Sequence, residues 1–122
     1  MLRVLFLLYK TMKKYFIMYM AKPADFKKVV AGMSKMSKAE MAEFSKEWGS
    51  WSKKIGMVDD GAPLGKNMRV TSRGAKASSN EIGGYGIIKA NSQAEAAKKL
   101  KNSPHFKMIK KGWIDVMEIL PM

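Results

Sequence analysis

Several residue types that commonly build functional sites are missing or scarce in this chain of 122 residues. Cysteine is absent, which excludes disulfide bonds and thiolate zinc sites. A single histidine, His105, leaves only carboxylates as further metal ligands, so we expect neither a metal nor a cofactor. Arginine occurs only at positions 3, 69 and 73, and the chain has no arginine-rich tract. Nucleic acid is therefore not the expected partner.

Long apolar runs are also lacking. The apolar stretch Val4–Tyr9 is too short to span a bilayer, so no transmembrane segment is expected. No small-residue cleavage site follows it, as a signal peptide requires. We interpret residues 1–11 as an N-terminal extension: first as an extra or mis-started segment, then as an interfacial anchor, and last as a signal peptide. The domain is expected to comprise residues 12–122 and to be cytoplasmic.

Positive charge, in contrast, is abundant. Lysine and arginine number 23 against 10 acidic residues, which gives a net charge of +13. Such an excess attracts anions, whether nucleic acid, an anionic membrane surface or an acidic ligand. A solvated basic surface explains the same composition, because the lysines are scattered along the chain.

The hydrophobic pattern predicts alternating strands and helices. The first strand, Tyr15–Met20, is apolar without alternation, which is typical of a strand covered on both faces. The first long helix is expected after Ser37, because Glu40 completes a capping box, and it should end before Gly56. The other predicted elements are a short helical turn at 25–33, strands at 57–64 and 66–72, a mobile loop at 73–80, a strand at 81–90, a helix at 93–101, a helical turn at 106–111 and a last strand at 113–120.

This order predicts an α+β fold, a ferredoxin-like split βαβ sandwich in which two helices cover one face of the sheet. The strands 15–20 and 113–120 carry apolar residues on both sides, so the other sheet face would be a large apolar patch. We therefore expect a homodimer that packs sheet on sheet. The polar side chains predicted on or near the closed face, which would form a small-molecule site, are Lys89, Asp115, Tyr15, Tyr19 and Tyr85.

Several segments resemble the YCII-related family of dimeric α/β barrels. They are KYFIMY from Lys14, EIGGYGII from Glu81, AEAA from Ala94, SPHF from Ser103 and IDVMEILP from Ile114. The resemblance covers residues 12–122 and implies the ferredoxin-like fold and the dimer. In the DGPF-type variant of this family an Asp-Gly-Pro-Phe loop precedes the Gly-Gly strand. This chain has Arg73-Gly74-Ala75-Lys76 there, so that loop's role does not carry over.

The candidate catalytic residues are His105, Asp115 and Tyr85. His105 is the side chain that titrates near neutral pH without a shift, as a general acid or base must. Asp115 would orient its ring, and Tyr85 would act as an acid or as a ring wall. Each also has a structural explanation: His105 as a helix cap, Asp115 as a partner of a surface lysine, and Tyr85 as core packing.

Three functions follow from these features. The first is a small-molecule enzyme or binder with a pocket inside the dimeric barrel and proton transfer by His105. The second is a non-catalytic structural or ligand-binding dimer. The third is a basic protein that binds nucleic acid or an anionic surface, with lysines gathered on one face.

Overall fold

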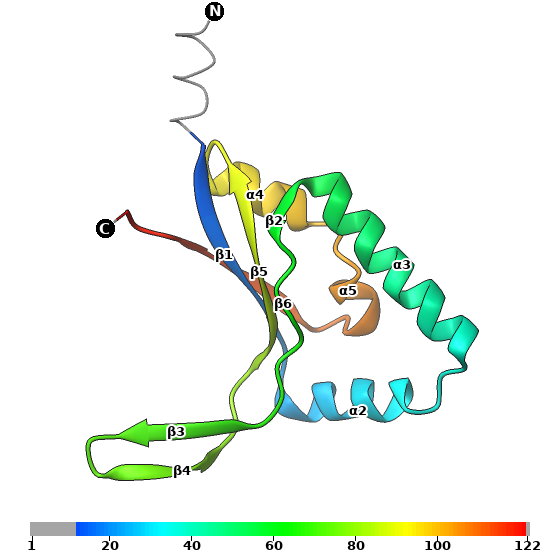
Figure 1. The fold of residues 1–122 in the computed structure, drawn as a ribbon, viewed down its shortest axis with the longest axis vertical. Helices are drawn as coiled ribbons and strands as arrows, with labels where there is room; N and C mark the ends of the chain where they lie inside the picture. The colour runs from blue at the N-terminus through cyan, green and yellow to red at the C-terminus, as the bar shows by residue number, and fades with distance from the viewer. Residues whose placement is uncertain (1–11, 122) are drawn as a thin grey trace, which may run out of the picture.

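The centre of the molecule is an antiparallel sheet of four strands in the order β2-β5-β1-β6. We describe residues 12–121 in a computed structural model of the chain (Figure 1). The described part is a mixed α+β structure whose strand order is compatible with a ferredoxin-like fold. The sheet strands are Lys13–Met20 (β1), Met57–Asp59 (β2), Ile82–Ala90 (β5) and Trp113–Glu118 (β6).

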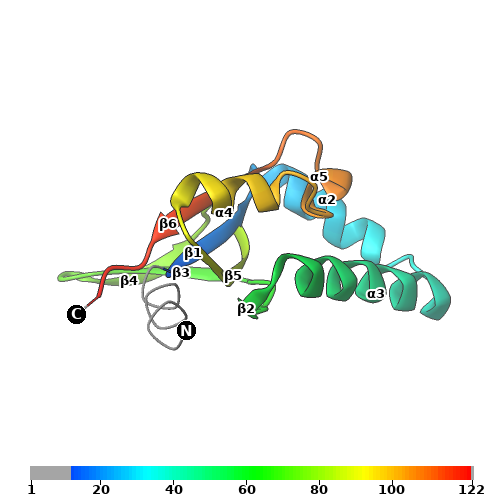
Figure 2. The same cartoon turned by 90° about the horizontal axis from the view of Figure 1, so that it is seen from above.

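Helices cover one face of this sheet (Figures 1 and 2). Their bounds are Pro23–Met33 (α2), Lys38–Ile55 (α3), Gln93–Leu100 (α4) and His105–Met108 (α5). The capping box at Ser37 and Glu40 is present, and Gly56 ends α3 in the left-handed conformation with φ 72°, so both predicted ends of this helix are confirmed. Among residues 12–121, no helix is long and apolar enough to cross a membrane.

The core lies between the sheet and α3 and α4. In β1, burial alternates strictly: Tyr15, Ile17 and Tyr19 are buried, whereas the residues between them are half-buried. Side chains of a strand point alternately to its two faces, so these three lie under the helices. The expectation that Tyr15 and Tyr19 fall on or near the closed dimer face is therefore wrong, because their position in the alternation turns them toward the helices.

Glycine allows α2 to pack closely on the sheet. A Cβ atom built at Gly83 would lie 2.2 Å from the ring of Phe26 in α2. The strand that contains Gly83 therefore has no room for a side chain at this position. The glycine at this position of β5 thus permits the close packing of α2.

Two predicted elements need correction. Residues 23–33 form a full helix instead of a short turn, because Pro23 fits the first helical turn and Asp25 interacts favourably with the helix dipole there. The segment 73–80 is not a loop: Gly74–Ser78 (β4) pairs with Asn67–Thr71 (β3) as a separate hairpin. The small residues of β4 suit a strand because the partner strand supplies the bulk. The predicted N-terminal extension, residues 1–11, lies outside the described residues.

Candidate functional site

The face of the sheet that the helices leave open carries three of the residues predicted for the small-molecule site, Tyr85, Lys89 and Asp115. Met18 of β1 lies opposite Tyr85 of β5 and opposite Asp115 of β6. Cross-strand partners in register share a face, so these three side chains form one row across the sheet. In the adjacent row, Phe16 of β1 lies between Ile87 of β5 and Met117 of β6. We call the following six residues the uncovered face: Phe16, Met18, Tyr85, Ile87, Asp115 and Met117.

The uncovered face is mostly apolar and open to solvent in the single chain. Phe16, Met18 and Ile87 are half-buried, and Met117 is 51% exposed. The rings of Phe16 and Tyr85 stack with their centroids 5.6 Å apart and an angle of 22° between planes. Asp115 is exposed at the β6 end of the row that it forms with Met18 and Tyr85. Apolar side chains beside a phenol and a carboxylate are typical of the lining of a small-molecule site.

His105 lies on the other side of the sheet, under the helices. It is 2% exposed, and its Nε2–H donates to the carbonyl oxygen of Met20 at 2.9 Å. Its backbone N–H donates to Oγ of Ser103 at 3.2 Å. The ring centroids of Tyr19 and Phe106 lie 5.5 and 5.7 Å from its own. His105 therefore ties the start of α5 to the end of β1.

Burial controls the titration of this histidine. Removal from water disfavours the charged imidazolium and lowers the pKa of His105 below its ordinary value. Hydrogen bonding to the backbone of Met20 and Trp113 acts in the opposite direction without reversing the shift. The neutral ring, with one N–H donated to a backbone carbonyl, is the form that the fold stabilises.

The structure does not bring the predicted dyad together. His105 contacts Tyr19, which faces the helices, whereas Asp115 shares the opposite face with Met18. Tyr85 lies in the same row as Asp115, so these two residues are grouped and His105 is separate. A catalytic role for the three residues stays a prediction, but the hydrogen bond that orients the His105 ring goes to the carbonyl oxygen of Met20 and not to Asp115.

A partly buried polar cluster accompanies Tyr19 on the helix side. Desolvation, with a smaller contribution from the Asp60 carboxylate, raises the pKa of the Tyr19 hydroxyl. The Ser52 hydroxyl donates to the same carboxylate. The indole rings of Trp48 and Trp51 pack on Tyr19 at 5.2 and 6.4 Å between centroids, so the aromatic stripe of α3 contributes to the core.

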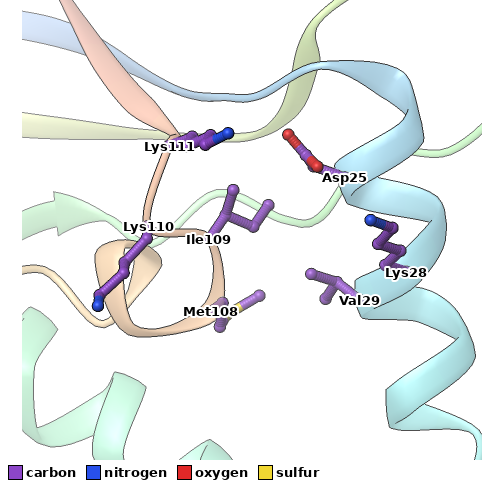
Figure 3. A pocket seen from close by; sticks show the side chains of 7 residues that line it. All are labelled: Asp25, Lys28, Val29, Met108, Ile109, Lys110 and Lys111. Carbon is purple, nitrogen blue, oxygen red and sulfur yellow. The ribbon is translucent and has the colours of Figure 1, made fainter.

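The sequence did not indicate a cavity of about 300 Å³ between α2 and α5 (Figure 3). In Figure 3 the side chains of Lys28 and Lys111 extend toward the carboxylate of Asp25, whereas Lys110 points away. The remaining wall is apolar and consists of Val29, Met108 and Ile109. The sequence signal for this cavity was two short lysine runs, one with Lys28 and one with Lys111. They lie on the same cavity only because residues 23–33 form a full helix.

This cavity has the chemistry of a site for a small amphiphilic anion. The two ammonium groups that extend into it, those of Lys28 and Lys111, outnumber the one carboxylate of Asp25, and ammonium groups bind phosphate and carboxylate oxygens well. The apolar wall would contact a short hydrocarbon or aromatic part. In the described part of the chain, no group of three acidic or histidine side chains is placed to hold a metal ion.

Comparison of the sequence with known protein families and with curated proteins finds no match to either. The function is therefore inferred from the geometry of residues 12–121. Two surfaces offer binding chemistry: the uncovered face, with Tyr85 and Asp115 in one row, and the lysine-lined cavity between α2 and α5. His105 belongs to neither surface. Its hydrogen bond to Met20 anchors α5, the helix that contributes Met108 to the lysine-lined cavity.

Proposed function

We propose that this chain is one subunit of a symmetric homodimer in which two uncovered faces meet and close an α/β barrel. The observation that carries the proposal is the one-sided covering of the sheet. Helices bury one face, while the other presents a mostly apolar patch of two rows across β5, β1 and β6. An apolar patch of this extent needs a partner, and a twofold axis satisfies both copies at once. The resemblance to YCII-related dimeric barrels supports the same assembly.

Inside this dimer we propose a binding site for a small organic molecule. The stacked rings of Phe16 and Tyr85 would contact its apolar part. The Tyr85 hydroxyl and the Asp115 carboxylate, on either side of Met18, would bind its polar groups. The function is thus ligand binding. Proton transfer by His105 is not included, because its ring is buried on the other side of the sheet.

The oligomeric state tests the proposal directly. Light scattering at low micromolar concentration should give about twice the chain mass of 13.7 kDa. Crystals of the dimer soaked with a library of small aromatic fragments should show density between the two sheets, next to Tyr85 and Asp115. A folded monomer at that concentration would overturn the dimer, and fragments bound everywhere except between the sheets would overturn the ligand site.

A second candidate function is favoured by the lysine-lined cavity: binding of a small anion that carries an apolar group. Phenyl phosphate is a suitable probe, followed by the NMR shifts of Val29 and Ile109. The double substitution Lys28→Gln and Lys111→Gln should raise its dissociation constant at least about tenfold, because charge-assisted contacts are each worth more than about 1.4 kcal/mol.

The matched control for this test is Lys98→Gln with Lys101→Gln. These lysines are exposed and belong to α4 and its C-terminal end, away from the cavity lining. The two control substitutions remove the same net charge as the cavity variant, so they measure the general effect of the basic surface on binding. Equal weakening by both double variants would show that phenyl phosphate responds only to net charge.

A further inference from the structure

The hairpin of β3 and β4 is an amphipathic ribbon. Its strands pair only with each other in the described sheets. On one face the cross-strand pairs are apolar, with Met68 opposite Ala77 and Val70 opposite Ala75. On the other face the central pair is Arg69 and Lys76. We call these the apolar face and the basic face of the ribbon.

Among residues 12–121, no side chain buries the apolar face. Met68 is 64% exposed and Val70 is 76% exposed, the largest exposed fraction among the large apolar side chains of the described residues. A two-stranded hairpin is marginally stable in water unless it packs against something. Apolar and basic residues alternate along its strands, which indicates one face suited to burial against another surface and one face suited to solvent.

The ribbon extends toward the place where a second subunit would bind. In Figure 1 it projects away from the sheet on the side opposite the helices, and Figure 2 shows the same relation from above. It begins after Leu64, which is 47% exposed and whose N–H donates to the carbonyl oxygen of Gly83 in β5. The start of the ribbon is therefore fixed beside β5, and an exposed apolar side chain lies at that junction.

We infer that the β3–β4 ribbon is an arm that packs its apolar face against the second copy of this chain; this inference rests on the homodimer proposed above. By the twofold symmetry each subunit supplies one arm and receives one. The receiving surface is expected at the far edge of the partner, where β6 and the segment after it expose apolar side chains. These include Met117 at 51% and Leu120 at 69% exposure.

The basic face of the ribbon then remains in solvent. The segment 61–80 contains no acidic residue, so the basic side chains of each arm repel those of any further arm that approaches edge to edge. Charged side chains on an exposed strand protect it from pairing with other chains. This division of roles explains why both arginines of the described residues, Arg69 and Arg73, lie in or beside this hairpin.

The test compares the two faces of the same ribbon. Met68→Lys with Val70→Lys changes the apolar face, and Arg69→Gln with Lys76→Gln is the matched control on the basic face. Sedimentation equilibrium should show a dimer dissociation constant at least about tenfold higher for the first pair, because two buried apolar side chains are lost per arm. The control pair should leave it within about twofold.

Amide hydrogen exchange gives a readout without changing the ribbon. Amides of residues 67–78 should be protected in the dimer and become unprotected when a substitution on the uncovered face separates the subunits. A dimer with unprotected ribbon amides would overturn the arm while leaving the dimer intact. A chain that is monomeric without substitution would overturn both.

The alternative partner of the ribbon is nucleic acid, and the same two pairs of substitutions distinguish it from a second subunit. The probe is a duplex of about 20 base pairs at two salt concentrations. If the basic-face pair abolishes salt-dependent duplex binding while the apolar-face pair leaves the dimer unchanged, the ribbon is a nucleic-acid arm and the inference is wrong. Absence of duplex binding together with dimer weakening by the apolar-face pair supports it.

Discussion

Phe16→Glu is expected to convert the dimer into a monomer with a mass near 13.7 kDa. Phe16 lies between Ile87 and Met117 in a row of the uncovered face. In the single chain it is half-exposed, so a carboxylate there stays hydrated and the domain still folds. In the dimer the twofold axis would bury two such charges without partners, each at a cost of several kcal/mol. The dissociation constant should rise by more than about a thousandfold.

Val30→Glu is the matched control for this experiment. Val30 is 66% exposed on α2, on the helix side of the molecule. The substitution adds the same charge and should leave the mass of the dimer unchanged in light scattering. A Phe16→Glu variant that remains dimeric would place the interface elsewhere, and the proposal of a ligand site between two sheets would fall with it.

Local signals in the sequence predicted α3 well because they do not depend on distant residues. Ser37 and Glu40 satisfy each other within one turn, and Gly56 adopts the left-handed conformation that ends the helix. The strands β1, β5 and β6 were also recognisable as apolar runs. Their combination with two helices was sufficient for the α+β class.

The side of the sheet on which each residue lies was less predictable. The first strand is apolar at every position from Tyr15 to Met20, so no alternation marks which face the helices cover. The strand at 66–72 was predicted, but its partner β4 was missed for a related reason. A run of small residues is a strand only when another strand pairs with it, and the pairing of Ala75 with Val70 is a property of the fold.

The position of His105 depends on contacts across the whole chain. Its acceptor, the carbonyl oxygen of Met20, lies 85 positions away in the sequence. A histidine after a proline suggested an accessible acid or base, but the fold uses it as a neutral donor among aromatic rings. The lysine-lined cavity was missed because it requires α2 and the segment after α5 to meet.

His105→Ala should therefore destabilise the protein substantially. The substitution would leave a cavity next to Tyr19 and Phe106 and would leave the Met20 carbonyl oxygen without its donor. The two effects together should cost about 3 kcal/mol, or a fall in melting temperature of roughly 10 °C or more. Lys110→Ala, at an exposed position soon after α5, is the control and should change the melting temperature little. An unchanged melting temperature for His105→Ala would show that the ring is not a structural support.

The pH dependence of stability gives a second and independent test of this role. Burial lowers the pKa of His105 in the folded state, whereas the unfolded chain titrates near about 6.5. In the pH window between these values the unfolded state binds more protons. The stabilising contribution of the neutral ring is therefore complete above about pH 6.5 and is lost as the pH falls toward the folded-state pKa.

The melting temperature of the unmodified protein should accordingly fall between pH 7 and pH 5, above the range in which ordinary carboxylates titrate. His105→Gln keeps a hydrogen-bond donor but cannot gain a proton in this window. Because His105 is the only histidine of the chain, this variant should show a flatter profile over the same range. A profile with the same slope in both proteins would mean that another group causes the pH dependence. A melting temperature that rises on acidification would mean that the fold prefers the charged ring, contrary to its burial among aromatic side chains.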